Sequence, residues 1–335
     1  MKVFLWFFEL ISVKKPAFTG DILMKKLVAL FGLLVILALM TSCTFKEKEL
    51  GTKDNPIKLF FVPSVEAKTL ADKSKVVKRL LEQLTPYHFE VRIPESYIAV
   101  VEAFGANRVD IAALNTFGYI LAHEKFGAQA LLTVVRYGRA TYRSTILARA
   151  DGKIKSLEDL SGKTIAYVDP ASTSGYLLPL KELKEKEIET GKHIFAMTHD
   201  AVVSMIYKGR VDAGAAFYSP PEEGEIQDAR RLVKTQYPDV EQKIKILHLT
   251  SDIPNEPVVF RKDMPDKMKK EVVEAFMKLI EMPEGKDAVG KLFGITELKA
   301  STDADYDGVR KMIKTLGTSA ANLVKDAASQ KAKKK

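Results

Sequence analysis

Residues 163–179, KTIAYVDPASTSGYLLP, lead from an apolar strand into the start of a helix. The segment 163–169 is rich in apolar and β-branched residues, and a helical apolar pattern begins near Gly175. Between them lie three consecutive hydroxyl side chains, Ser172, Thr173 and Ser174. A helix start leaves backbone N–H groups unpaired and carries partial positive charge, so it can bind an anion. One helix cap needs one hydroxyl. Three in a row favour oxyanion binding, with simple capping as the open alternative.

The alternation of strand and helix extends along the chain in two rounds. Strand-like segments lie at 57–63, 89–94, 109–115, 128–136, 163–169, 193–198, 211–217 and 244–250. Helix-like segments lie at 76–84, 97–108, 116–127, 175–189 and 200–209, and 264–316 is predicted to be helical. This βα alternation predicts an α/β protein with largely parallel sheets.

Two segments between the rounds, 142–151 and 255–263, are predicted to be extended connectors. A chain that crosses twice forms two lobes, with a ligand cleft between them and closure by a hinge. The predicted first lobe comprises 55–146 and 256–316, and the second lobe comprises 147–255.

The segments VDIAALN (109–115) and VDAGAAF (211–217) resemble one another, and each follows a helix and a glycine-containing turn. They indicate either that the two lobes have the same topology or only that a helix, a glycine turn and a strand commonly follow one another.

The N-terminal region predicts export. Residues 24–43, MKKLVALFGLLVILALMTSC, have the two lysines, apolar run and small residues of a signal peptide, ending at the chain's one cysteine, Cys43. The pattern resembles a bacterial lipobox, although Met40 replaces the usual Leu, Val or Ile. We therefore predict a signal peptide over 1–42 and lipid attachment at Cys43. An uncleaved anchor is the alternative, but 27–40 is short for a span of ~20 residues. We interpret residues 1–23 as a start-site artefact, because Met24 begins a complete signal.

The predicted mature chain carries little excess charge. Removing residues 1–42, which hold five lysines and two acidic residues, leaves a net charge of +6. Four of those charges are lysines of the terminal KAKKK. We interpret 43–54 as a lipidated tether and 317–335 as a basic, flexible tail. The small net charge of the mature chain gives no support for nucleic-acid binding.

Enzyme motifs are missing from the sequence. It has no P-loop, no GxGxxG and no G-x-S-x-G, and its five histidines show no metal-ligand spacing. We predict no enzymatic activity, no cofactor and no metal.

Several ordered segments resemble the phosphate, phosphite and phosphonate-binding proteins of ABC importers, the PhnD-like family. The resemblance covers about 55–316, and its most specific part is DPASTSGYLLP (169–179). Similar too are SYIAVVEAFGANRVDIAAL, THDAVVSMIYKGRVDA, DIPNEPVVFRKDMP and the late FGITEL and DADYDGVR. The resemblance implies a type II periplasmic-binding-protein fold, with two lobes joined by two crossing segments.

The resemblance also implies a ligand site. It places in the site, beside the three hydroxyls, Tyr97, Tyr142, His199 and Glu256. Asn115 and Thr116 stand where the family often has a glycine-containing turn, and we expect them to donate hydrogen bonds. Ser219 lies near the place where aminophosphonate binders have a carboxylate, so an amine-bearing ligand is not favoured.

Glu256 has a specific predicted role. An ionised carboxylate accepts hydrogen bonds and cannot donate them, so it would favour a ligand with a P–OH over fully ionised sulfate. Surface pairing with Arg261 is the alternative.

The sequence thus predicts a monomeric, lipid-anchored protein of the cell envelope, facing the periplasm or exterior, that delivers a phosphorus oxyanion to an ABC permease and ATPase. Two alternatives stay open: a ligand-sensing lipoprotein of the same fold that acts on a sensor partner, and an extracytoplasmic phosphoester enzyme.

Overall fold

The computed structural model describes residues 48–315 and residue 322. The predicted signal peptide, Cys43, residues 44–47 of the tether and nearly all of the tail lie outside the described residues. The fold is that of the compact unit that begins at Glu49. Within the described residues no helix combines the length and the apolar character that a membrane span requires.

The first sheet has six strands in the order β11-β4-β10-β3-β1-β2. Its strands are β1 (Ile57–Phe61), β2 (Phe89–Arg92), β3 (Ile111–Ala113), β4 (Gln129–Arg136), β10 (Pro257–Phe260) and β11 (Ile295–Ala300). Strands β1, β2 and β3 are parallel, whereas β10 pairs antiparallel with both β3 and β4. The returning strand thus inserts between β3 and β4, so the sheet is mixed and not largely parallel as predicted.

The second sheet has five strands in the order β7-β6-β8-β5-β9. Its strands are β5 (Thr141–Arg149), β6 (Ile165–Tyr167), β7 (His193–Phe195), β8 (Ala213–Tyr218) and β9 (Ile244–Pro254). Apart from the edge strand β11, the two sheets have the same topology. The order β2-β1-β3-β10-β4 of the first sheet corresponds, strand by strand, to the order β7-β6-β8-β5-β9 of the second. Strands β3 and β8 occupy equivalent places, which favours like topology as the reason for the resemblance between VDIAALN and VDAGAAF.

The predicted connectors are strands of the sheets. Both are extended, as expected, but β5 pairs along its length with β8 and β9, and β10 pairs with β3 and β4. The passages between sheets are therefore shorter and lie at 137–140 and 255–256. A lobe boundary after residue 146 would cut β5, so we propose that the second lobe begins near Thr141.

Of the segment predicted to be helical, residues 266–315 are mainly helical, but they include the strand β11, which the helical prediction missed. Gly294 ends the preceding helix with φ +67°, a conformation that glycine adopts without strain. The chain after it turns back and pairs antiparallel with β4.

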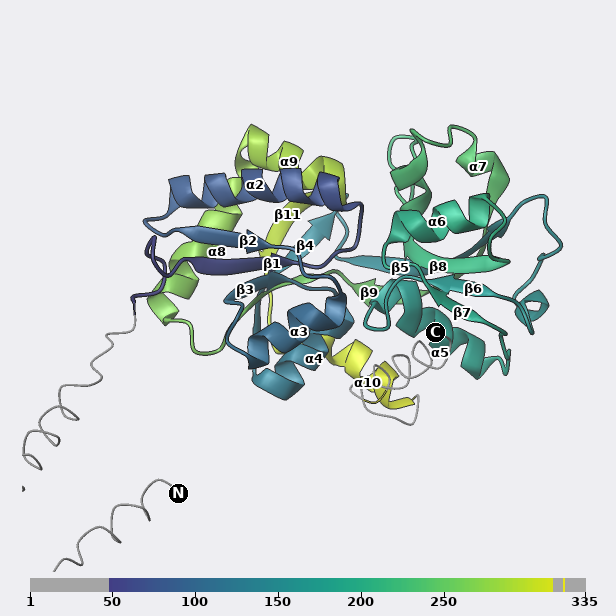
Figure 1. Cartoon of the computed structure of the whole chain (residues 1–335), viewed down its shortest axis with the longest axis horizontal. Helices are drawn as coiled ribbons and strands as arrows, with labels where there is room; N and C mark the ends of the chain where they lie inside the picture. The colour runs from purple at the N-terminus through teal and green to yellow at the C-terminus, as the bar shows by residue number, and fades with distance from the viewer. Residues whose placement is uncertain (1–47, 316–321, 323–335) are drawn as a thin grey trace, which may run out of the picture. The chain divides into compact units, whose positions relative to one another are not determined.

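Helices cover both faces of the first sheet (Figure 1). The longer helices are α2 (Ala67–Leu84), α3 (Tyr97–Gly105), α4 (Thr116–Phe126), α5 (Leu178–Glu185), α6 (His199–Tyr207), α8 (Asp266–Glu281), α9 (Pro283–Phe293) and α10 (Asp307–Thr315). The short ones are η2 (Glu158–Leu160), η3 (Thr173–Leu177, a π-helical turn), η4 (Ala229–Val233), α7 (Val240–Lys243) and η5 (Asp303–Tyr306). Helices α2, α8 and α9 contact one another over one face, and α3 contacts α4 over the other.

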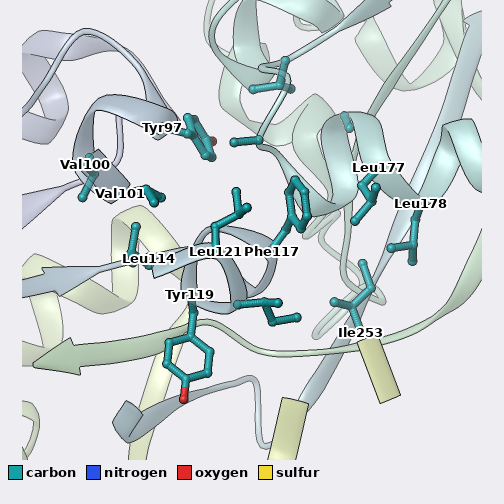
Figure 2. Packing of buried hydrophobic residues seen from close by; sticks show 14 of the residues in the cluster. Tyr97, Val100, Val101, Leu114, Phe117, Tyr119, Leu121, Leu177, Leu178 and Ile253 are labelled. Atoms are coloured by element: carbon teal, nitrogen blue, oxygen red, sulfur yellow. The ribbon is translucent and has the colours of Figure 1, made fainter. Parts of the chain in front are cut away.

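The buried apolar side chains form a cluster that belongs to both sheets. In Figure 2, Phe117 and Leu121 of α4 lie beside Leu177, Leu178 and Ile253 of the second lobe. A separate cluster lies between the first sheet and helices α2 and α8. Burial of apolar area at about 25 cal/mol per Å² is the main stabilising term in both.

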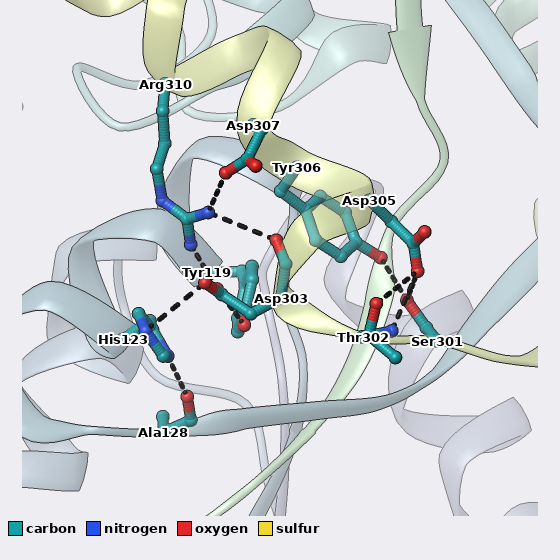
Figure 3. Close-up of polar contacts among 10 residues, drawn as sticks. All are labelled: Tyr119, His123, Ala128, Ser301, Thr302, Asp303, Asp305, Tyr306, Asp307 and Arg310. Atoms are coloured by element: carbon teal, nitrogen blue, oxygen red, sulfur yellow. Dashed lines mark hydrogen bonds and ion pairs between the residues drawn. The ribbon is translucent and has the colours of Figure 1, made fainter.

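The C-terminal helix is fixed to α4 by a polar network (Figure 3). Asp303 accepts a hydrogen bond from the Tyr119 hydroxyl at 2.6 Å and pairs with Arg310. His123 donates from Nδ1 to the Ala128 carbonyl at 2.8 Å, because a carbonyl can only accept, and its Nε2 lies 3.5 Å from Asp303. The network holds residues 303–315 against the first lobe.

Candidate functional site

Two adjoining cavities, of about 130 and 60 Å³, lie where the two sheets face one another. Both are lined by the same six polar residues: Ser64, Arg136, Tyr142, Ser174, His199 and Glu256. Helices α3, α4, η3 and α6 all begin near this junction, because each follows the carboxyl end of a parallel strand. The N-terminal ends of these helices contribute partial positive charge there.

The three hydroxyls have different roles. Ser172 is the N-cap of η3, because its Oγ accepts from the Gly175 N–H at 3.1 Å. Capping uses only its acceptor, so its O–H can still donate into the larger cavity, which it lines. Ser174 lines both cavities. Gly175 allows η3 to approach β6, since a Cβ there would lie 2.4 Å from Cγ2 of Val168.

Thr173 joins the two lobes. Its Oγ1 accepts from the Phe117 N–H and from Asn115 Nδ2, each at 2.9 Å. Asn115 Nδ2 also donates to the Ala171 carbonyl at 2.7 Å, which fixes the orientation of the amide because that carbonyl only accepts. Both donors of Asn115 are thus used within the protein, which departs from the expected donation to a ligand, although Asn115 lines the larger cavity.

Thr116 also differs from the prediction. Its Oγ1 donates to the Pro254 carbonyl at 2.8 Å, and it is absent from the described lining of both cavities. Thr173 is absent from that lining as well. Thr116 and Thr173 therefore hold the first lobe against the second.

Two buried tyrosines face the larger cavity. Tyr97 begins α3, where Ser96 caps the helix by accepting from the Ala99 N–H. Burial raises the pKa of Tyr97 well above its ordinary value. Burial, followed by the negative charge of Glu256, also raises the pKa of Tyr142. Both phenols therefore stay neutral and can donate hydrogen bonds at physiological pH.

His199 is a neutral donor. It is the first residue of α6 and is 6% exposed. The Phe217 N–H donates to its Nδ1 at 3.3 Å, so Nε2 carries the proton. Burial, and next the positive charge of Arg136, lower the pKa of His199 to about 3. The ring thus presents an N–H donor to the cavities without a charge.

The cations of the site were not predicted from the sequence. Arg136, at the end of β4, is ion-paired with Glu256, and both line both cavities. Arg231 of η4 lines the smaller cavity together with Gln227. Burial, and next the positive charge of Arg136, lower the pKa of Arg231. Glu256 does not pair with Arg261, whose partner is Asp110 at 3.0 Å.

The charges of the cavity side chains suit a small anion. Two guanidinium groups that approach one another in a buried place repel, and an anion between them removes that repulsion. With Glu256 ionised and His199 neutral, Arg136 and Arg231 leave one net positive charge. Hydroxyl, imidazole and guanidinium donors face the same space, whereas the described residues contain no group of three or more His, Cys, Asp or Glu able to hold a metal.

The structure therefore places most of the predicted site residues around the cavities. Those that line one or both are Tyr97, Asn115, Tyr142, Ser172, Ser174, His199 and Glu256. Ser219, noted for its position after β8, lines the smaller cavity. Arg136, Arg231 and Ser64 are added by the structure.

Sequence comparison then identifies the family. Residues 59–306 match the family model for the ABC transporter, phosphonate, periplasmic substrate-binding protein. The chain belongs to this family. It is 32% identical over 197 residues to the phosphate-import protein PhnD of Mycolicibacterium smegmatis, covering 53% of this chain and 61% of that protein. It is 26% identical over 228 residues to the phosphonates-binding periplasmic protein of Escherichia coli, covering 64% and 63%. The chain thus spans about three fifths of these curated relatives.

Solved structures show the same type II periplasmic-binding-protein fold. A binding protein component of an ABC phosphonate transporter from Pseudomonas aeruginosa has a TM-score of 0.68 at 21% identity, covering 83% of this chain and 96% of that one. PhnD1 from Prochlorococcus marinus, in complex with methylphosphonate, has a TM-score of 0.68 at 17% identity, covering 78% and 98%. The fold expected from the sequence is confirmed.

Proposed function

We propose that this protein captures a phosphorus oxyanion, that is phosphate, phosphite or a phosphonate, outside the cytoplasm for an ABC importer. The observation that carries the proposal is the convergence of Arg136, Arg231 and the donors of Ser174 and His199 on buried cavities between two lobes. Membership of the periplasmic substrate-binding family supports it. The printed names of the relatives, a phosphate importer and a phosphonates-binding protein, support the ligand class.

Each cavity group has a distinct proposed task. Arg136 and Arg231 supply the charge that attracts the anion, at about 1.5–3 kcal/mol for each charge-assisted hydrogen bond. Ser172, Ser174 and His199 donate to separate oxygens and so fix the orientation of the tetrahedral group. Glu256, held in place by Arg136, accepts from a P–OH. A ligand that keeps one proton and one negative charge satisfies all of these groups.

The lobes would close over the ligand and open at the membrane. The hydrogen bonds from Asn115 and Phe117 to Thr173 close one side of the junction, and the backbone N–H of His199 donates to the Ser64 carbonyl at 3.1 Å on another. We propose that the passages at 137–140 and 255–256 are the hinge, that Cys43 carries a lipid anchor in the cell envelope, and that a monomer delivers the ligand to the permease and ATPase.

Calorimetry with phosphate, phosphite, methylphosphonate, aminoethylphosphonate and sulfate tests the proposal. We expect at least one of the first three to bind with micromolar or tighter affinity and to bind more tightly than sulfate. Absence of binding by all phosphorus ligands, or equal binding of sulfate, would overturn it.

A matched pair of variants links the binding to the site. Arg231→Gln removes a buried guanidinium of the cavity and should weaken binding by about tenfold or more. Arg143→Gln removes the same charge from the exposed face of β5, where Arg143 pairs with Asp252 and lines neither cavity, and should leave affinity unchanged.

A further inference from the structure

The larger cavity has an apolar part that the oxyanion does not need. Beyond the polar residues it continues between the first sheet and helices α2, α8 and α9. Its apolar lining comes from Leu59, Phe61, Val77, Val134, Val258, Phe276, Leu279, Ile280, Val289, Ile295 and Leu298.

The lining follows from strand geometry. Leu59 and Phe61 are two residues apart on β1, so their side chains point to the same face of the sheet. Both belong to the buried cluster under α2 and α8, as do Val77 and Phe276. Ala113, at the carboxyl end of β3, packs against this cluster and lines the cavity, and its neighbours in the chain, Leu114 and Asn115, line the same cavity.

An unfilled apolar space of this size is unusual inside a protein. Cores pack at the density of organic crystals, and each void costs stability through lost contacts. The whole cavity, polar and apolar parts together, measures about 130 Å³. An engineered cavity of about 150 Å³ in another protein, lined by similar side chains, stays dry and binds benzene. With the oxyanion in the polar part, the smaller apolar part has room for a short alkyl chain.

We propose that the ligand is an organophosphonate with an apolar substituent, whose hydrocarbon part enters the space under α2, α8 and α9. This rests on the proposed function, because the phosphonate group is held by the polar end of the same cavity. A substituent with an amine is disfavoured, since no acidic side chain among the described residues lines the apolar part. Because the polar and apolar parts belong to one cavity, the orientation of the ligand follows. Its oxygens lie against Arg136 and Ser174, and its carbon atoms lie against Phe61 and Phe276.

Phosphonates with alkyl substituents of increasing length, measured on the unmutated protein, test the proposal without any variant. Calorimetry would compare methyl-, ethyl-, propyl- and butylphosphonate. Burying one methylene should raise affinity about fourfold, so butylphosphonate should bind roughly 50-fold more tightly than methylphosphonate. Equal or falling affinity along the series would overturn the proposal, while binding of methylphosphonate and phosphate would leave the proposed function standing. If no member binds, the proposed function fails as well.

A matched pair of variants on α2 locates the substituent. Val77 lines the cavity, whereas its neighbour Val76 packs against the same cluster without lining the cavity. Val77→Phe should fill the space and bring the affinity for butylphosphonate down to that for methylphosphonate. Val76→Phe should keep the full chain-length dependence. If the dependence survives in a folded Val77→Phe protein, the substituent does not enter this space.

Discussion

Replacing Glu256 with glutamine should raise the affinity for sulfate and reduce the preference for phosphate. The Glu256 side chain is 24% exposed and pairs with Arg136, which is 15% exposed. A unit charge about 5 Å from a ligand oxygen contributes about 3 kcal/mol of repulsion at an effective dielectric constant of ~20. The ion pair and the partial exposure reduce this to about half. Removing the charge should therefore improve sulfate binding by about tenfold.

Phosphate should respond differently to the same change. As a monoanion near pH 6 it gains less electrostatic relief than doubly charged sulfate, and it exchanges the carboxylate that accepts from its P–OH, a charge-assisted bond of roughly 1.5–3 kcal/mol, for a neutral amide oxygen. The ratio of phosphate to sulfate affinity should thus fall by a factor of about 10 to 100.

Calorimetry with both anions near pH 6, where phosphate keeps a proton, measures that ratio. Glu222→Gln is the control, because it removes the same charge from an exposed residue that lines neither cavity. An unchanged ratio in a folded Glu256→Gln protein would refute the role of the carboxylate as an acceptor.

Three other predictions follow from the site. Ser174→Ala should weaken oxyanion binding by about tenfold or more in calorimetry with little change in thermal midpoint, and unchanged affinity would remove Ser174 from the site. Because burial lowers the pKa of His199 to about 3, the unfolded chain takes up a proton as pH falls below about 6.5 while the folded protein does not, so stability is lost in that range. His199→Gln should therefore lose about 1 kcal/mol less per pH unit than the unmutated protein between pH 6.5 and 5 in denaturant titrations, and parallel losses would contradict this. Small-angle scattering should show a smaller radius of gyration at saturating ligand, and identical profiles would argue against hinge closure at 137–140 and 255–256.

The alternation of strands and helices could be predicted because hydrophobic periodicity is a local signal. The partners of each strand could not. Whether 141–149 is a connector or a strand depends on β8 and β9, which lie some 65 to 110 residues later in the chain. The extended conformation of this segment was evident from its sequence, whereas its place in the second sheet required the tertiary structure.

The residues of the candidate site also divide into those that the sequence could predict and those that required the tertiary structure. Ser172 and Ser174 stood out because three hydroxyls at a helix start are rare, and His199 stood out through the resemblance. Arg136 and Arg231 look like surface residues, since VVRYGR and DARRLV carry no local sign of burial. Only the passage at 137–140, which brings the end of β4 to the second lobe, places Arg136 beside the cavities.

The hydrogen bonds across the junction set an energy scale for ligand release. Among the described residues, Asn115 Nδ2 donates to Ala171 and Thr173, the Phe117 N–H donates to Thr173, Thr116 Oγ1 donates to Pro254, and the backbone N–H of His199 donates to Ser64. Each such bond contributes about 0.5–1.5 kcal/mol net, because water replaces it when the lobes part. The five together resist separation by roughly 2.5–7.5 kcal/mol. Thermal motion can supply that amount, so the ligand-free protein should open and reseal unaided, and the strength of the closed state should depend mainly on what the cavity contains.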